Sequence, residues 1–228
     1  MHQNSHGRGK IELNMNLSAV IFDLDGTVLD NEDEYGLAFR KVLRRLGKSV
    51  DKRRPHISGI GVKENWPILL DKYKIHTKKT FEELAQETQE VCRSLLDRVK
   101  ITPGFEKFVT GLAESNIATA LATSNSWWMV DEIDDIFGIT KYFDVVTTVE
   151  EVEYKKPDPE IFLLTAQKLG IEPKECLVIE DAQAGIDAAR AAGMKVIGIS
   201  KKWGNELKDA DLVVKNFEEI TLDILLTI

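Results

Sequence analysis

Short apolar runs alternate with amphipathic helical patterns along most of this 228-residue chain. Continuous apolar runs of this kind are typical of strands that are covered on both faces, as in a parallel sheet. The helical patterns between them supply the crossover connections that parallel strands require. The alternation therefore predicts an α/β fold, a doubly wound parallel sheet.

The expected strands share an apolar character and end in small or polar residues. The first is residues 18–22 (SAVIF), and the others are ATALAT, FDVVTT, ECLVIED and MKVIGIS, with DLVVKN as a possible last strand. Between them lie the helical patterns PGFEKFVTGLAESN, SWWMVDEIDDIFG, DPEIFLLTAQKLG and AQAGIDAARAAG. Glycines at the ends of these patterns suit helix C-termini.

One segment, residues 31–99, carries helical patterns but no convincing buried strand. Helices inserted directly after the first strand would lie over the carboxyl ends of the strands, where open α/β sheets bind ligands. We therefore expect residues 18–30 and 100–228 to form an α/β core and residues 31–99 to form an inserted α-helical cap domain. Residues 1–17 are polar, lack the apolar centre of a signal peptide, and are expected to be a disordered leader.

The composition is that of a soluble globular protein, with 43% apolar and 30% charged residues. A net charge of −8 argues against a nucleic-acid surface, because neutralising a duplex takes clustered Lys and Arg. No apolar run reaches the ~20 residues of a transmembrane helix, so no membrane contact is expected. Cys92 and Cys176 lack metal-ligand spacing and are expected to be reduced residues of a cytoplasmic protein.

Two aspartates, Asp23 and Asp25, follow the first apolar run in the sequence IFDLDGTVLD. Residues two apart in a strand point the same way, so both carboxylates share a direction where the strand ends. A hard divalent cation would offset their repulsion. Gly26 permits a sharp turn, and Thr27 offers a hydroxyl. For this pattern alone, a pair of solvated carboxylates is the alternative.

Polar side chains follow three other expected strands. Thr123, Ser124 and Asn125 end the second long run, where hydroxyls and an amide can bind an anion near a helix N-terminus. Lys156 follows the third run within KKPDP and carries a positive charge.

The fourth run ends in Glu180 and Asp181, whose carboxylates can complete an oxygen-ligand shell begun by Asp23. Each of these patterns alone is typical of a helix cap or a solvated turn. Four of them in this order, each at a strand end of an alternating chain, together indicate a single site.

These motifs resemble those of the haloacid dehalogenase-like hydrolases, in the branch that contains β-phosphoglucomutase, phosphoglycolate phosphatase and 2-deoxyglucose-6-phosphatase. The resemblance covers about residues 18–220. FDLDGTVLD is similar to the first motif of the family, LATSNS to the second, KKPDPEIF to the third and LVIEDAQAGIDAARAAGM to the fourth.

The resemblance implies four catalytic residues. Asp23 would attack the phosphoryl group and form an aspartyl-phosphate. Asp25 would protonate the leaving alcohol and then activate water. Thr123 and Lys156 would bind the transferring phosphoryl oxygens and neutralise the developing charge.

The resemblance also implies Mg²⁺ as cofactor. Its expected ligands are Asp23, the backbone carbonyl of Asp25, and Asp181, with Glu180 beside them. The expected partner is a small phosphorylated substrate, and the expected oligomeric state is a monomer.

The expected substrate contacts lie in the first and second motifs and in the cap. Those in the core are Thr27, Ser124 and Asn125. Those in the cap are Lys63 and, with weaker support, Arg53, Arg54, His56 and Trp66. Trp66 suits the cap core equally well. One of Trp127 and Trp128 is expected to pack in its helix, while the other could face the pocket or a partner.

The main functional hypothesis is a magnesium-dependent phosphatase that acts on a sugar or polyol phosphate. A phosphosugar mutase of the β-phosphoglucomutase type is the alternative. The mutases of this branch tend to carry a Thr and a His where this chain has Asn31 and Tyr35, and an apolar residue where it has Thr27, which disfavours that reading. A catalytically silent binding protein on the same fold is a third possibility, and the carboxylates of Asp25 and Asp181 argue against dehalogenation.

Overall fold

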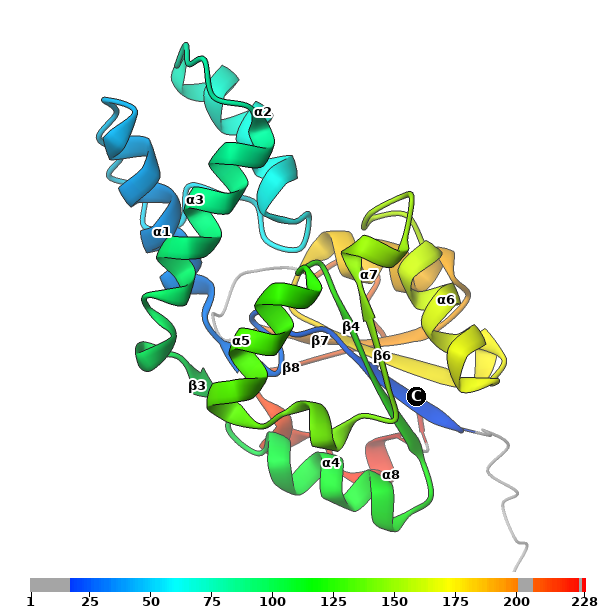
Figure 1. Cartoon of the computed structure of the whole chain (residues 1–228). Coiled ribbons are helices and arrows are strands. Elements are labelled where there is room, and N and C mark those ends of the chain that lie inside the picture. The colour runs from blue at the N-terminus through cyan, green and yellow to red at the C-terminus, as the bar shows by residue number, and fades with distance from the viewer. Residues whose placement is uncertain (1–16, 201–206, 226) are drawn as a thin grey trace, which may run out of the picture.

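The structure is a computed structural model that describes residues 17–200, 207–225 and 227–228, so the expected leader lies almost entirely outside the described residues. Within the described part, six parallel strands form one sheet in the order β5-β4-β1-β6-β7-β8 (Figure 1). They are β1 (Ala19–Phe22), β4 (Ala118–Thr123), β5 (Val145–Thr148), β6 (Cys176–Glu180), β7 (Lys195–Ile199) and β8 (Leu212–Val214). This order confirms the predicted doubly wound sheet, and β8 confirms the possible last strand.

Helices cover both faces of the sheet, which explains the continuous apolar runs. They are α4 (Phe105–Glu114), α5 (Trp127–Phe137), α6 (Glu160–Leu169) and α7 (Gln183–Ala191), followed by the short α8 (Leu222–Leu225). In β1, Val20 and Phe22 join the apolar cluster of α4 and α5, whereas Ala19 and Ile21 join that of α6 and α7. Figure 1 shows these two helix pairs on opposite sides of the sheet.

Short 3₁₀ turns complete the connections between these elements. They are η1 (Leu96–Arg98), η2 (Thr140–Tyr142), η3 (Val149–Glu151), η4 (Pro173–Glu175) and η5 (Phe217–Glu219). Gly138 and Gly170 end α5 and α6 in the left-handed conformation, with φ of 59° and 70°. This conformation suits glycine at a helix C-terminus, as the sequence predicts. None of the helices in the described ranges is both long and apolar enough to cross a bilayer.

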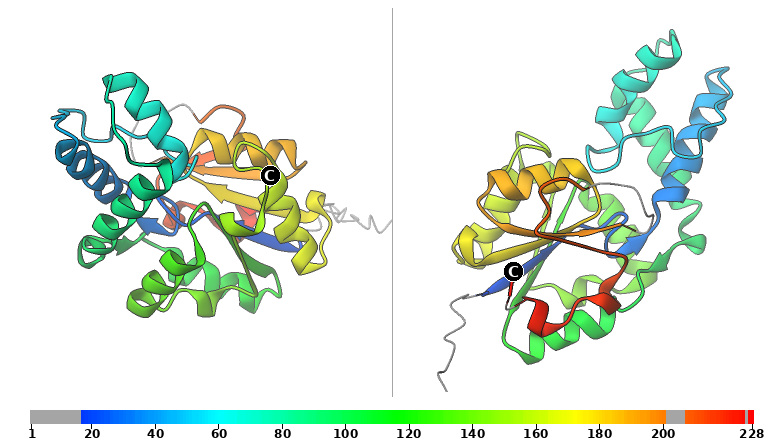
Figure 2. Two further views of the ribbon diagram at one scale, coloured as in Figure 1. Left: turned by 45° about the horizontal axis from the view of Figure 1, so that its top comes forward. Right: turned by 180° about the vertical axis from the view of Figure 1, so that it is seen from behind.

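The segment after β1 forms a helical insertion of α1 (Glu32–Arg45), α2 (Val62–Tyr73) and α3 (Phe81–Arg93). At its root, β2 (Leu29–Asp30) pairs antiparallel with β3 (Lys100–Ile101). Figure 2 shows the inserted helices beside the sheet rather than within its layers. Trp66 is fully buried among them and donates its indole N–H to Thr88 Oγ1 at 3.2 Å. The sequence predicts that Trp66 either contacts the substrate or packs in the cap core, and in the structure it packs in the core of the inserted helices.

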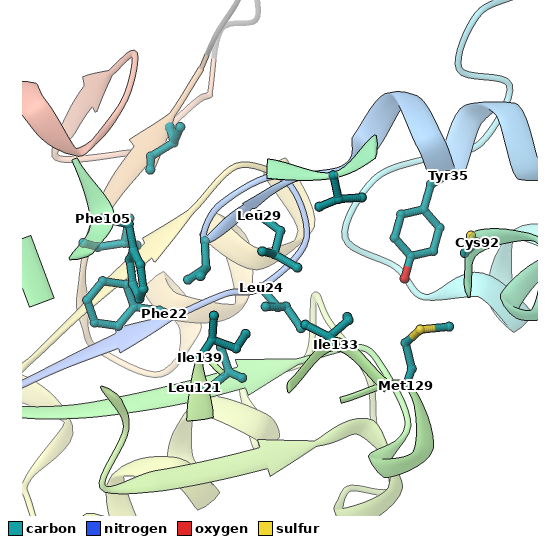
Figure 3. Close-up of a cluster of buried hydrophobic side chains, with 14 of the residues drawn as sticks. Phe22, Leu24, Leu29, Tyr35, Cys92, Phe105, Leu121, Met129, Ile133 and Ile139 are labelled. Atoms are coloured by element: carbon teal, nitrogen blue, oxygen red, sulfur yellow. The ribbon is translucent and has the colours of Figure 1, made fainter. Parts of the chain in front are cut away.

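One apolar cluster joins the insertion to the sheet. In Figure 3, Leu24 and Leu29 lie between Phe22 on the sheet side and Tyr35 on α1, with Cys92 of α3 close by. Each of these side chains is buried. The helical insertion therefore packs directly on the end of the sheet where β1 terminates.

Candidate active site

A buried lysine connects the ends of two neighbouring strands. Lys156 Nζ donates to Asp23 Oδ1 at 2.7 Å, to Glu180 Oε1 at 2.9 Å and to the carbonyl of Ala122 at 3.2 Å. Asp23 directly follows β1, and Glu180 is the last residue of β6, which pairs with β1. The sheet order therefore brings together residues that are far apart in the sequence.

The three charged groups are almost completely removed from water: Lys156 is 3% exposed, Asp23 6% and Glu180 0%. Burial favours the neutral form of Lys156, but the Asp23 and Glu180 carboxylates outweigh it and raise the lysine pKa above its usual range. Burial is also the largest influence on Asp23 and, with the nearby carboxylates, raises its pKa although Lys156 lowers it. One cation thus offsets only part of the negative charge in this group.

Asp181 completes a group of carboxylates that fits a divalent cation. Asp23, Glu180 and Asp181 each offer an oxygen, and these oxygens lie within 4.8 Å of one another. Burial, followed by the charges of Glu32 and Glu180, raises the pKa of Asp181 well above its usual range. Buried carboxylates in such excess over positive charge suit a hard cation with oxygen ligands.

Two glycines permit this close packing. A Cβ on Gly26, whose φ is 84°, would overlap the Asp181 carboxylate, and a Cβ on Gly185 would overlap Glu180 Oε1. Glu180 Oε2 accepts the backbone N–H of Ala182 at 2.7 Å, so one oxygen is held by the loop before α7 and the other by Lys156. In this arrangement Glu180 holds Lys156 and this loop while lying beside the metal-binding oxygens.

Two amides hold Asp25. Asn31 Nδ2 donates to Oδ1 of Asp25 at 2.5 Å, and Asn125 Nδ2 donates to Oδ2 at 2.7 Å. The backbone N–H of Gly26 donates to Asn31 Oδ1 at 3.0 Å, and Tyr35 donates its hydroxyl to Asn125 Oδ1 at 3.0 Å. A hydrogen-bonded chain thus runs from α1 of the insertion through Asn125 to the Asp25 carboxyl.

Burial raises the pKa of Asp25 to about 6, although the hydrogen bond from Asn31 acts in the opposite direction. The negative charge of Glu32 adds to the increase, and the bond from Asn125 opposes it. A carboxyl with this pKa can both give and take a proton near neutral pH, as a general acid and base must.

A cavity lies between these carboxylates and the helical insertion. Its walls include Asp23, Asp25 and Ser124 from the core side and Glu32, His56 and Ser58 from the insertion side. Ser124 also joins the two sides, because its hydroxyl donates to the carbonyl of Gly59 at 3.2 Å. Asp23 and Asp25 therefore face the space between the core and the inserted helices.

The residues that the sequence assigns to the second motif are brought to this site. Thr123 is fully buried at the end of β4, and its Oγ1 accepts the N–H of Asn125 at 3.1 Å. Ser124 and Asn125 line the cavity. The side-chain amide of Asn125 is engaged by Asp25 and Tyr35, so it positions Asp25 in addition to facing the cavity.

Two predicted substrate contacts are not brought to the cavity. Thr27 is fully buried, does not line the cavity, and its hydroxyl has no partner among the described residues. Lys63 projects from the outer side of α2, where it pairs with Glu82. Lys63 does not line the cavity, because the first turn of α2 directs it toward Glu82 of α3.

The weaker candidates divide between the cavity and the surface. His56 lines the cavity, whereas Arg53 and Arg54 both pair with Asp33 of α1 outside it. Trp127 and Trp128 are 39% and 42% exposed, and neither lines the cavity. In this structure, therefore, neither tryptophan faces the cavity.

Sequence reasoning missed Glu32 and Ser58, which lie on the insertion side of the cavity. Glu32 opens the acidic run EDE at the start of α1, a pattern typical of a solvated first turn, yet it is only 5% exposed. No local signal distinguishes it, because its partners are 24 and 26 residues away in the chain.

The fold and these strand-end residues define a hydrolase of a known class. A model of the family described as "haloacid dehalogenase-like hydrolase" matches residues 20–199. The chain belongs to this family, and it is an enzyme of the phosphatase type.

Three similar proteins show which kinds of enzyme in this family the chain resembles. A phosphorylated carbohydrates phosphatase of Thermotoga maritima is 32% identical, with 92% of this chain and 98% of the relative covered. A β-phosphoglucomutase of Bacillus subtilis is 30% identical, with 92% and 94% covered. The crystal structure of a β-phosphoglucomutase from Clostridium difficile has a TM-score of 0.81 at 29% identity, with 92% and 95% covered.

Proposed function

We propose that the chain is a magnesium-dependent phosphatase that hydrolyses a small sugar or polyol phosphate through an aspartyl-phosphate intermediate. The observation that carries this proposal is the meeting of Asp23, Asp25, Lys156 and Asp181 at one end of the sheet, beside a cavity under the helical insertion. The similarity to a phosphorylated carbohydrates phosphatase supports the substrate class.

In the first step, Asp23 attacks the phosphoryl group, and the bond to the alcohol oxygen breaks. Lys156 neutralises negative charge on the phosphoryl oxygens, and the Thr123 hydroxyl donates to one of them. Asp25 gives its proton to the leaving alcohol oxygen. The pKa of about 6 for Asp25 is consistent with this proton transfer.

In the second step, Asp25 takes a proton from water, which attacks the phosphorus and releases Asp23. The amides of Asn31 and Asn125 hold the Asp25 carboxylate in place for this step. Bound through Asp23 and Asp181, with Glu180 beside them, Mg²⁺ would supply positive charge that stabilises the transferring phosphoryl group.

A β-phosphoglucomutase activity is the second candidate, because a relative of that name is 30% identical over most of the chain. A mutase must keep its phospho-aspartate from water until the sugar binds again. Asn31 and Tyr35, at the positions where mutases of this branch tend to have Thr and His, engage Asp25 directly or through Asn125. This difference favours hydrolysis.

The test is phosphate release from a panel of sugar, polyol and carboxylic-acid phosphates, with and without Mg²⁺. We expect Mg²⁺-dependent release that disappears in Asp23→Asn and persists in the surface control Glu114→Gln. Conversion of β-glucose 1-phosphate to glucose 6-phosphate after addition of a bisphosphate primer, without phosphate release, would instead establish the mutase. Release that survives Asp23→Asn would contradict the aspartyl-phosphate route.

A further inference from the structure

The cavity is lined by negative charge on both sides. Asp23 and Asp25 lie on the core side, and Glu32 lies on the insertion side. None of the described residues that line it is a lysine or an arginine. Lys156 is held behind Asp23 by two carboxylates and does not line the cavity.

Three cations of the insertion and of the facing core loop pair with other carboxylates. Arg54 pairs with Asp33 at 2.7 Å, Lys63 pairs with Glu82, and Lys155 of the core pairs with Glu64. Lys156 therefore lies behind the core end of the cavity, and none of the described residues places a lysine or an arginine at its insertion end, where His56 is hydrogen-bonded to Glu32.

Glu32 is fixed as a hydrogen-bond acceptor at that insertion end. Its Oε2 contacts His56 Nε2 at 3.2 Å and accepts the Ser58 hydroxyl at 2.5 Å. Within the described parts of the chain, its Oε1 accepts no hydrogen bond, so this oxygen is available to a ligand. His56 in turn stacks on Phe39, with ring centroids 5.0 Å apart and planes 15° apart.

This arrangement suits a hydroxyl and repels an anion. A carboxylate oxygen that faces a cavity accepts a hydrogen bond from an alcohol O–H. A carboxylate or a second phosphate on the leaving alcohol would instead lie beside Glu32 in a poorly solvated space, where like charges repel strongly.

We infer that the cavity selects phosphate esters of neutral, polyhydroxylated alcohols, and that Glu32 rejects esters that carry a carboxylate or a second phosphate. Glu32 accepts a hydroxyl of the leaving alcohol, while His56 and Ser58 hold its carboxylate in place. This inference rests on the proposed function and narrows its substrate class.

Matched substrate pairs test the inference. Glycerol 3-phosphate and 3-phosphoglycerate differ by a CH₂OH group in place of a carboxylate, as do sorbitol 6-phosphate and 6-phosphogluconate. In each pair we expect kcat/KM to be higher for the neutral member by about a hundredfold, since like charges placed in contact are strongly disfavoured. Equal kcat/KM within both pairs would overturn the inference.

Two variants assign this preference to Glu32. Glu32→Gln keeps the shape and an acceptor oxygen but removes the charge, and we expect it to reduce the preference at least about tenfold, mainly through a lower KM for the anionic ester. Ile57→Arg adds a cation at a cavity position that is 48% exposed, and should also improve the anionic esters. Glu82→Gln, which changes an exposed carboxylate outside the cavity, should leave the preference unchanged. An unaltered preference in both Glu32→Gln and Ile57→Arg would exclude Glu32 as its source.

A binding measurement distinguishes a failure of this inference from a failure of the proposed function. If no ester releases phosphate, p-nitrophenyl phosphate included, the phosphatase proposal fails. Calorimetric titration of the same pairs into Asp23→Asn with Mg²⁺ still decides the inference. Tighter binding of the neutral member supports it, and equal or reversed affinities overturn it.

Discussion

Lys156 is the residue on which the electrostatics of the site depend. It is buried, and its three hydrogen bonds all go to groups at strand ends. Without it, Asp23 and Glu180 would face each other with no positive charge between them. Its removal is therefore expected to affect folding as well as catalysis.

We predict that Lys156→Met lowers the free energy of unfolding by about 3–5 kcal/mol in the absence of metal, because it leaves buried carboxylates without a partner. Urea unfolding in EDTA measures this loss, and added Mg²⁺ should restore part of it. Lys168→Met is the matched control. It breaks the more exposed pair with Glu151, and exposed pairs contribute only about 0–1 kcal/mol. Equal losses in the two variants would contradict the prediction.

Glu32 gives a prediction for the pH dependence of stability. Burial acts to raise the pKa of Glu32, but the hydrogen bond and charge of His56, with the bond from Ser58, together lower it below its usual 4.5. A lowered folded-state pKa contributes stability that is present above the unfolded pKa and is lost as pH falls through the folded pKa.

The difference in melting temperature between the wild type and Glu32→Gln should therefore be largest above pH 5 and should shrink below about pH 4.5. Thermal unfolding followed by circular dichroism at several pH values measures it. The exposed Glu114→Gln serves as the reference. A difference that stays constant from pH 7 to pH 3 would show that the Glu32 carboxylate is not specifically stabilised.

At the residue scale, the sequence predicts those site residues that belong to contiguous motifs at strand ends. Asp23, Asp25, Lys156 and Asp181 are found in this way because each follows an apolar run that predicts a strand. Glu32 could not be found, since its burial depends on a loop more than twenty residues away.

At the scale of single elements, the close approach of α7 to β6 leaves no room for an added side chain. Gly185, in the first turns of α7, touches the carboxylate at the end of β6. A side chain at this position would displace Glu180, which orients Lys156.

We predict that Gly185→Ala lowers both the melting temperature and kcat/KM for the best substrate. Its methyl group would occupy the space of Glu180 Oε1. Gly111→Ala in α4 is the matched control, because a Cβ there would meet no described atom within 4 Å outside its own helix backbone, and alanine in a helix is favoured by roughly 0.5–1 kcal/mol. Thermal unfolding and steady-state kinetics compare the two variants. Retention of full activity in Gly185→Ala would contradict the assigned packing.

Periodicity is sufficient to predict the sheet strands and their flanking helices, because covered strands and amphipathic helices leave strong apolar patterns. It misses β2 and β3, which contain two residues each and have no pattern of their own. Their pairing depends on residues 29 and 101 meeting in space, which only the complete fold determines.

At the scale of the whole molecule, polar contacts hold the helical insertion against the core. Arg93 of α3 contacts Glu132 of α5 at 2.6 Å, and Lys155 of the core pairs with Glu64 of α2. Both pairs are partly exposed, and each such pair contributes only about 0.2–1 kcal/mol. These pairs resist a separation of the two parts only weakly, so most of the resistance comes from the shared apolar cluster.

We predict that the double variant Glu64→Gln, Glu132→Gln increases the rate of thiol labelling at Cys92 several-fold. Cys92 is buried in the cluster that the insertion shares with the core, so it becomes accessible when the two parts separate. Labelling with a maleimide, located by peptide mass spectrometry, measures this rate. Cys176, buried on the other face of the sheet, is the internal control. Equal acceleration of both thiols would indicate global unfolding instead.

The strand order has a consequence for how the protein is made on the ribosome. β1, which ends beside Asp23, pairs only with β4 and β6 in the described sheet, and β4 begins at Ala118. At about 5–20 residues per second, the ribosome needs several seconds to make this partner. During that interval the inserted helices can fold through local contacts, whereas the apolar strand still lacks both of its partner strands. Chains released before residue 181 lack part of the carboxylate cluster, so prematurely terminated products should be inactive.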